Sequence, residues 1–185
     1  MNFNPDNITS IHMFQTPIRQ TWGDLFFMNE LLTNLKFDHL VELGTYQGGL
    51  AVFLGLHAYS RGIDVVTFDI RQEPQNTGWR KFKPLLPITF YQLDVFSEKA
   101  LSIVREKARS GRMFIVLDGG DKPKDFETYA PLLTGNDVVL IHDKGKYIHD
   151  YEATPIAERN GLVPFYQEEA DKLNSRCFSY IKKYK

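Results

Sequence analysis

The chain has 185 residues, of which 43% are hydrophobic and 14% aromatic, and its formal net charge is −1. One domain of ordinary size fits this length, so we treat residues 1–185 as a single unit, and the apolar fraction argues against wholesale disorder. A nearly neutral charge argues against a nucleic-acid partner, because nucleic-acid-binding domains are usually basic. No apolar run approaches the roughly 20 residues that span a bilayer, so we expect no membrane partner.

The cysteine content and the N-terminal segment indicate in which cellular compartment the protein works. Cys177 is the one cysteine, so an intrachain disulfide framework is excluded, which is typical of a reducing environment. The segment MNFNPDNITS lacks an apolar stretch after a basic start and does not resemble a secretory signal. We therefore expect a cytoplasmic protein.

Residues 1–36 are interpreted as an N-terminal segment and a helix that precede a sheet. The start is irregular, and then Leu25, Met28 and Leu32 recur at helical spacing. Thr21 and Asp24 stand three residues apart just before them, as in a capping box. A helix is therefore expected to begin after Thr21.

Short apolar segments then alternate with helix-compatible ones. Strands are expected at residues 39–43, 65–68, 88–93, 113–117 and 138–141, and helices at 50–60, 98–110 and 123–133. The last part offers a helix around Ile156 and a strand at 177–184. This alternation predicts an α/β fold: a Rossmann-like, doubly wound, mostly parallel sheet with helices on both faces and a C-terminal antiparallel edge strand.

The predicted strands carry Gly44, Asp69, Asp118 and Asp143 at their carboxyl ends. In an open parallel sheet these ends line the ligand crevice, so the polar side chains should converge where a ligand binds.

The most informative stretch is VELGTYQGGLAVF, residues 41–53. Its glycines allow a tight turn and a close ligand approach, and the helix that follows offers free N–H groups. The pattern is E-x-G-x-x-x-G-G, from Glu42 through Gly44 to Gly48 and Gly49. It is not the G-x-G-x-x-G of nicotinamide-binding proteins. A tight turn without a ligand is the alternative.

The spacing of Glu42, Gly44 and Gly48 resembles the loop that binds S-adenosylmethionine (SAM) in class I methyltransferases. Together with TPIRQTWGD, residues 16–24, it is similar to the family of cephalosporin hydroxylase-like and rhamnosyl O-methyltransferases. Residues 115–143 are similar to the corresponding segment of sugar and macrolide O-methyltransferases. The resemblance implies a SAM cofactor, with Glu42 at the methionine ammonium and with Gly44, Thr45, Gly48 and Gly49 around the cofactor.

Two further acidic residues follow the next two strands. Asp69 lies 25 residues after Gly44, and a carboxylate there can accept hydrogen bonds from both ribose hydroxyls. The alternative is a solvent-facing carboxylate. Asp94 matches the position of the family residue near the adenine amino group, and its alternative is a turn aspartate.

Asp118, His142 and Asp143 form a second group at two adjacent strand ends. Such ligands could hold a divalent cation, and their oxygen atoms favour Mg²⁺ or Ca²⁺ over Zn²⁺. The resemblance implies such a metal site too. The family pattern has Glu-Asp where this chain has His142–Asp143, so His142 is either a ligand or a catalytic base. Polar strand ends without a metal are the alternative.

Asp121 and Lys122 complete the catalytic candidates, although the related motif has His at position 121. Lys122 could help to deprotonate a hydroxyl if its ammonium were desolvated, or it is an exposed lysine at a helix start. We thus predict a SAM-dependent O-methyltransferase, with Mg²⁺ assistance left open, for a hydroxyl of a sugar or glycosylated natural product. A SAM- or nucleotide-binding module without transfer activity and a nicotinamide-dependent reductase are the alternatives, and a homo-oligomer is left open.

Overall fold

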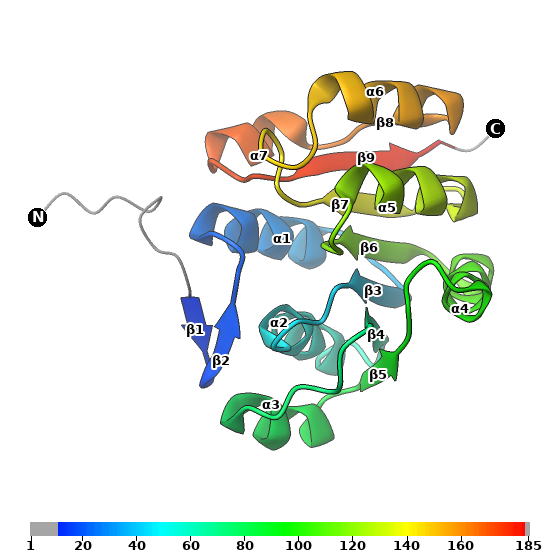
Figure 1. Cartoon of the computed structure of the whole chain (residues 1–185). Helices are drawn as coiled ribbons and strands as arrows, with labels where there is room; N and C mark the ends of the chain where they lie inside the picture. The colour runs from blue at the N-terminus through cyan, green and yellow to red at the C-terminus, as the bar shows by residue number, and fades with distance from the viewer. Residues whose placement is uncertain (1–10, 184–185) are drawn as a thin grey trace, which may run out of the picture.

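The computed structural model of the chain describes residues 11–183; the first ten residues of the predicted N-terminal segment lie outside this range. Its centre is a seven-stranded sheet in the order β5-β4-β3-β6-β7-β9-β8 (Figure 1). The strands are β3 (His39–Leu43), β4 (Asp64–Asp69), β5 (Ile88–Gln92), β6 (Met113–Leu117), β7 (Val138–Ile141), β8 (Leu162–Pro164) and β9 (Phe178–Lys182). A hairpin of β1 (Ile11–Met13) and β2 (Thr16–Ile18) precedes them.

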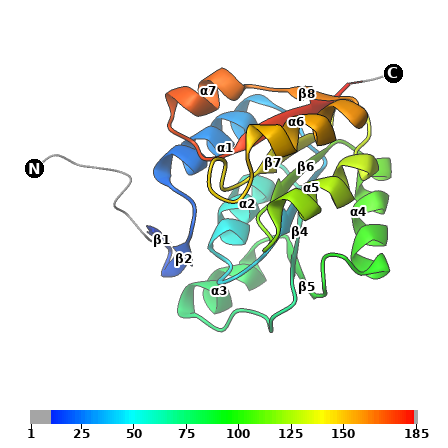
Figure 2. The ribbon, with the colours of Figure 1, turned by 45° about the horizontal axis from the view of Figure 1, so that its top comes forward.

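Helices cover both faces of this sheet. The helices are α1 (Trp22–Asn34), α2 (Gly49–Tyr59), α3 (Thr77–Phe82), α4 (Glu98–Ser110), α5 (Lys122–Tyr129), α6 (Asp150–Arg159) and α7 (Gln167–Lys172), with short 3₁₀ turns at η2 (Lys83–Leu85) and η3 (Ala130–Leu132). Side chains of α1, α2, α3 and α7 pack in one core, and those of α4, α5 and α6 pack in another. Figure 2 shows α5 and α6 in front of the strands. None of the helices in residues 11–183 combines the length and apolarity needed to cross a membrane.

The central strands are apolar because both of their faces are covered. All five residues of β6 are buried, and β7 is buried throughout. Strands of a parallel sheet with helices on both faces have this continuous apolar character, because neither face meets water. This explains why the sequence predicted β3, β6 and β7 with their observed bounds.

The direction of chain progression reverses between β3 and β6. β3 pairs in parallel with β4 on one side and with β6 on the other, where Leu43 lies opposite Leu117. The chain moves outward through β4 and β5, returns to β6, and then continues to β7 on the opposite side. The loops after β3 and β6 therefore meet at a topological switch point, the usual ligand position in an open α/β sheet.

The α/β fold class is confirmed, and so is the capping box, in which the Thr21 hydroxyl accepts from the Asp24 backbone N–H while the Asp24 side chain accepts from the Thr21 N–H. The antiparallel C-terminal strand is confirmed as β9, which pairs with β7. The sequence did not predict β8, which lies outside β9, or the hairpin, α3 and α7. These elements have three to six residues each, which is too short for a periodic pattern.

Candidate active site

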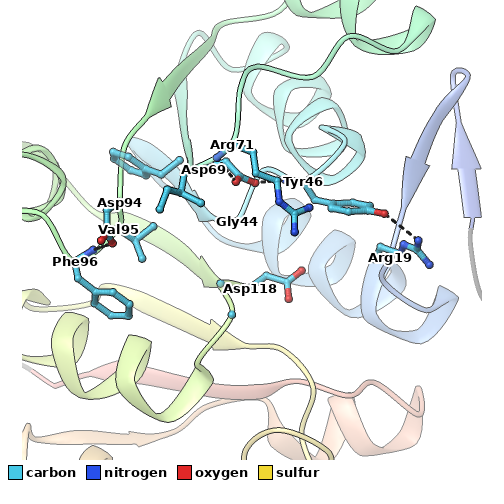
Figure 3. A pocket seen from close by; sticks show the side chains of 13 residues that line it. Arg19, Gly44, Tyr46, Asp69, Arg71, Asp94, Val95, Phe96 and Asp118 are labelled. Atoms are coloured by element: carbon cyan, nitrogen blue, oxygen red, sulfur yellow. Dashed lines mark hydrogen bonds between the residues drawn. The ribbon is translucent and has the colours of Figure 1, made fainter.

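A pocket of about 570 Å³ opens at the carboxyl edge of the sheet, at the switch point (Figure 3). The ends of four strands and the loops after them line it: Gly44 and Tyr46 after β3, residues 68–71 at the end of β4, residues 94–96 after β5 and residues 118–120 after β6. Arg19, which follows β2, also lines it and donates a hydrogen bond to the Tyr46 hydroxyl at 3.0 Å. The strand ends singled out in the sequence therefore share one cavity, except that of β7.

Gly44 allows the loops after β3 and β6 to touch. Its φ is +97°, and a Cβ atom at this position would lie 2.4 Å from the carbonyl oxygen of Asp118. The backbone N–H groups of Gly44 and Thr45 both donate to the Phe68 carbonyl oxygen. Any side chain at position 44 would force the two loops apart.

Asp69 presents its carboxylate in the pocket wall. Its Oδ2 accepts a hydrogen bond from the Tyr46 N–H at 2.7 Å, and its Oδ1 accepts one from the Arg71 N–H at 2.9 Å (Figure 3). Each carboxylate oxygen has a second lone pair, so both can still accept a hydrogen bond from a ligand. The arrangement suits a vicinal diol.

The loop after β5 forms the other end of the pocket. Asp94 Oδ1 accepts a hydrogen bond from the Phe96 N–H at 2.8 Å, and Val95 and Phe96 add apolar surface beside it. Lys124 Nζ lies 3.8 Å from the centre of the Phe96 ring. The pocket thus combines an acidic group for a diol with an apolar region beside a second carboxylate.

Glu42 lies beneath the pocket and is 1% exposed. It accepts a hydrogen bond from the Thr67 hydroxyl at 2.5 Å, and the Thr67 and Thr45 hydroxyls are 2.5 Å apart. Burial, reinforced by the charges of Asp118 and Asp69 and opposed by the Thr67 hydrogen bond, raises the pKa of Glu42 to about 8. Glu42 also lines a small cavity with Gly44 and Thr45 beside the main pocket, where a cationic ligand group would favour its ionised form.

Gly48 and Gly49 have packing roles in the structure. A Cβ atom on Gly48, whose φ is +83°, would lie 2.1 Å from the ring of Trp79. A Cβ atom on Gly49 would lie 2.2 Å from the Pro17 carbonyl oxygen. These glycines bring the start of α2 close to α3 and β2, whereas the main pocket is lined by Gly44.

The ends of β6 and β7 carry a group of charged residues around His142. His142 Nδ1 lies 3.1 Å from Asp118 Oδ1 and 3.5 Å from Asp143 Oδ2, and its Nε2 lies 3.1 Å from Asp24 Oδ2. Both ring nitrogens therefore face carboxylates. We call this group the ionic cluster; its members are Asp24, Asp118, Lys122, His142, Asp143 and Arg176.

The ionic cluster sets the charges of its members. Burial opposes ionisation of His142, but Asp118, Asp143 and Asp24 outweigh this effect and raise the His142 pKa well above its usual value. Burial would raise the pKa of Asp118, but the nearby His142 and Lys122 lower it instead. A base must accept a proton, which a protonated imidazole cannot do, so this arrangement does not favour His142 as the base; its catalytic role stays a prediction.

Lys122 is buried, not an exposed helix-start lysine. It is 3% exposed, and its Nζ donates to Asp118 Oδ1 at 2.7 Å and to the Gly119 carbonyl oxygen at 2.5 Å. Asp121 is exposed and caps α5 by accepting from the Lys124 N–H at 3.1 Å. Asp121 thus has a structural task, and we do not include it in the proposed catalytic group.

The three predicted metal ligands converge. One ligand atom from each of Asp118, His142 and Asp143 lies within 4.8 Å of the others, a spacing that a single cation could bridge. Of these residues, Asp118 also lines the main pocket.

Sequence reasoning missed several residues of the site. Asp24 is fully buried, and besides its capping contacts it bonds to His142, Ser175 and the Arg176 N–H. Gln20 Nε2 donates to Asp118 Oδ2 at 2.6 Å. Both lie in TPIRQTWGD, which the family resemblance included; a helical pattern assigns Asp24 only to the cap.

Comparisons with solved structures place the fold among methyltransferases. An apo structure of CmcI is 17% identical in sequence to this chain, with a TM-score of 0.69; the match covers 95% of this chain and 77% of the CmcI chain. A structure of CmcI with magnesium and SAM is also 17% identical, with a TM-score of 0.63; this match covers 89% of this chain and 73% of the CmcI chain. A third match is the N-methyltransferase NodS from Bradyrhizobium japonicum, in complex with S-adenosyl-L-homocysteine (SAH). It is 12% identical, with a TM-score of 0.57, and the match covers 87% of this chain and 86% of the NodS chain.

The family comparison extends beyond the fold. No curated protein matches the sequence significantly. The family described as rhamnosyl O-methyltransferase/CmcI matches residues 6–162, which include the main pocket's lining and most of the ionic cluster. Because this match spans well over half of the chain, the protein belongs to the rhamnosyl O-methyltransferase/CmcI family.

Proposed function

We propose that the protein is a SAM-dependent O-methyltransferase that acts on a hydroxyl of a small molecule, such as a sugar or a glycosylated natural product. The observation that carries this proposal is the main pocket at the switch point, with the Asp69 carboxylate held in its wall by two backbone N–H groups. The family is one of O-methyltransferases, and the solved CmcI and NodS structures described with SAM or SAH support the cofactor.

The pocket accommodates the parts of SAM in a defined order. Asp69 would accept hydrogen bonds from the ribose hydroxyls, and the loop at 94–96 would hold the adenine, with Asp94 at its amino group. The methionine part would lie over Gly44 and Thr45, with its ammonium near Glu42. Gly48 and Gly49 would support this loop through their packing. Gly44 lines the pocket and brings its loop against the backbone of Asp118 and Gly119, which supports a cofactor lying across the two loops.

Asp118 is the group best placed to meet the acceptor. It lines the main pocket, while Gln20, Lys122 and His142 fix its carboxylate from behind. SAM supplies an activated methyl group, and the protein must align the acceptor oxygen with that methyl and exclude water. We propose that Asp118 accepts a hydrogen bond from the acceptor hydroxyl and takes its proton while the acceptor oxygen bonds to the methyl carbon and the methyl–sulfur bond of SAM breaks, which leaves SAH.

A binding module without transfer activity is the second candidate. One observation favours it: both ring nitrogens of His142 are engaged by carboxylates, so this histidine has no free nitrogen with which to accept a proton from a substrate. Incubation with methyl-labelled SAM and a panel of sugars and glycosides separates the two, since labelled product arises only from an enzyme. The cytoplasmic location and assembly into a homo-oligomer stay predictions.

Cofactor binding is tested by thermal unfolding with SAH, SAM and NAD⁺. A ligand that binds only the folded state at a hundred times its dissociation constant adds about 2.7 kcal/mol of stability. SAM and SAH should raise the melting temperature, whereas NAD⁺ should not. Stabilisation by NAD⁺ alone would overturn the proposed function.

A further inference from the structure

Lys122 occupies the space that a divalent cation would need between Asp118 and Asp143. Its Nζ lies 2.7 Å from Asp118 Oδ1 and 3.8 Å from Asp143 Oδ2. Magnesium binds its oxygen ligands at about 2.1 Å in near-octahedral geometry and keeps several waters. An ion coordinated by these two carboxylates would overlap the ammonium group or push it away.

The fold holds the ammonium in this place. Lys122 is the first residue of α5, directly after the cap residue Asp121, so the helix start fixes its backbone. Its side chain is buried, and a second hydrogen bond reaches the Gly119 carbonyl oxygen at 2.5 Å. Displacing the ammonium would break this hydrogen bond to the half-buried Gly119, which costs free energy.

His142 offers no free ligand atom in this arrangement. A metal-bound imidazole must point a nitrogen lone pair at the ion. Here Nδ1 faces Asp118 and Asp143, and Nε2 faces Asp24. The donor set that the metal hypothesis requires is therefore already used within the protein.

Two permanent cations already lie beside the carboxylates of the ionic cluster. Lys122 forms ion pairs with Asp118 and Asp143. The Arg176 Nη1 lies 3.9 Å from Asp143 Oδ1, and its Nε lies 3.8 Å from Asp24 Oδ2. A divalent ion at these carboxylates would be repelled by both cations.

We propose that the Lys122 ammonium is the resident cation of this site: it takes the place of a divalent ion and positions Asp118 at the pocket, so that the wild-type protein binds Mg²⁺ weakly. Lys122 is then a positioning residue, because its contacts are with Asp118 and Gly119 and not with the pocket. The divalent-cation interpretation of Asp118, His142 and Asp143 applies only when this ammonium is removed.

The test is a metal titration in the absence of cofactor, with Mg²⁺ followed by calorimetry and Mn²⁺ followed by electron paramagnetic resonance. Wild-type protein should show no saturable binding at millimolar metal. Lys122→Met, which keeps the chain length without the charge, should bind both ions at least about tenfold more tightly, because a positive charge near the ion has been removed. The matched control is Lys124→Met, an exposed lysine on the same helix, which should leave metal affinity unchanged.

Circular dichroism and a thermal melt establish that the variants fold, and Lys122→Gln serves if Lys122→Met does not. Stoichiometric Mg²⁺ or Mn²⁺ binding to the wild type that is lost in Asp143→Asn would overturn the proposal, as would equal affinity in Lys122→Met, Lys122→Gln and the wild type. The titration needs no SAM, so a failure of SAH to bind would remove the proposed function and leave this inference standing.

Discussion

The carboxyl edge of the sheet has two halves that use acidic residues in opposite ways. After β4 and β5, Asp69 and Asp94 are partly or fully exposed and accept hydrogen bonds from backbone N–H groups in their own loops. After β6 and β7, Asp118 and Asp143 are paired with Lys122, His142 and Arg176. The first half keeps its acceptor capacity for a ligand, whereas the second half uses most of its capacity inside the protein and only Asp118 also faces the pocket.

The difference comes from what covers each half. The start of α1 brings Asp24 over the end of β7, and the segment before β9 adds Ser175 and the Arg176 N–H, both bonded to Asp24 Oδ1. Once a carboxylate is buried, it needs a cation or a proton. Glu42, buried between the halves, lies next to carboxylates and instead has a raised pKa. Asp69, Asp118 and Asp143 are all half-buried, so these strand-end residues differ because their charged neighbours differ.

The largest expected effect is at Asp24, the most buried anion of the ionic cluster. Asp24→Asn should lower the free energy of unfolding by about 4 kcal/mol, since removing one partner of a buried ion pair leaves the other charge uncompensated. Urea unfolding at pH 7 measures it. The matched control is Asp171→Asn, which removes an exposed partner of Lys144 and should change stability by less than about 1 kcal/mol. Equal effects of the two changes would remove the distinction between the halves.

Glu42 provides a pH-dependent test. Its pKa is about 8 in the folded protein against an ordinary value of 4.5, so the folded state retains a proton that the unfolded state releases. Stability therefore falls as the pH rises from about 4.5 to 8. Glu42→Gln removes this loss and should be more stable than the wild type by about 3 kcal/mol at pH 7, with no such gain at pH 4. Urea unfolding at both pH values measures the difference; a gain that is the same at pH 4 and pH 7 would contradict the raised pKa.

The contrast between the halves also explains what the sequence could predict. Continuous apolar strands and capping residues are local signals, so the sheet, the Thr21–Asp24 cap and the helix cap at Ser97 were predicted from neighbouring residues alone. The pocket residues after β3, β4 and β5 also follow strand ends directly. One partner of His142, Asp24, could not be found in this way, because it lies 118 positions away and already had a local explanation as a cap.

The burial of individual side chains was the second feature that the sequence could not predict. Lys122 follows a helix cap, a position where a lysine is usually exposed, and nothing in the adjacent sequence indicates that Asp118 and Gly119 would enclose it. The packing of the loop glycines was hidden in the same way. Gly48 and Gly49 were predicted as cofactor contacts, and the structure adds that Trp79 and Pro17, from distant parts of the chain, leave no room for a Cβ atom at either position.

In the exposed half, Asp69 should govern affinity and not stability. Asp69→Ala should weaken SAH binding by about 2 kcal/mol, or about thirtyfold, because hydrogen bonds to a charged group contribute roughly 1.5 to 3 kcal/mol. Isothermal titration calorimetry measures it, and circular dichroism checks the fold. Asp69→Asn, which keeps one acceptor oxygen, should lose less. Wild-type affinity in Asp69→Ala would mean that the ribose binds elsewhere.

The smallest expected effect is at Asp94, where one residue has two separable roles. Its Oδ1 caps the turn by accepting from the Phe96 N–H, and we propose that its other oxygen accepts from the adenine amino group. Asp94→Asn keeps an acceptor for the turn, so it should fold like the wild type, yet weaken SAH by about 1 kcal/mol. The wild type should prefer SAH to its inosine analogue, in which an oxygen replaces the amino group, and Asp94→Asn should lose that preference. If the preference for SAH survives the substitution, Asp94 acts only in the turn. A direct contact between the Asp94 carboxylate and the adenine amino group must show coupling when both are changed, as in a double-mutant cycle.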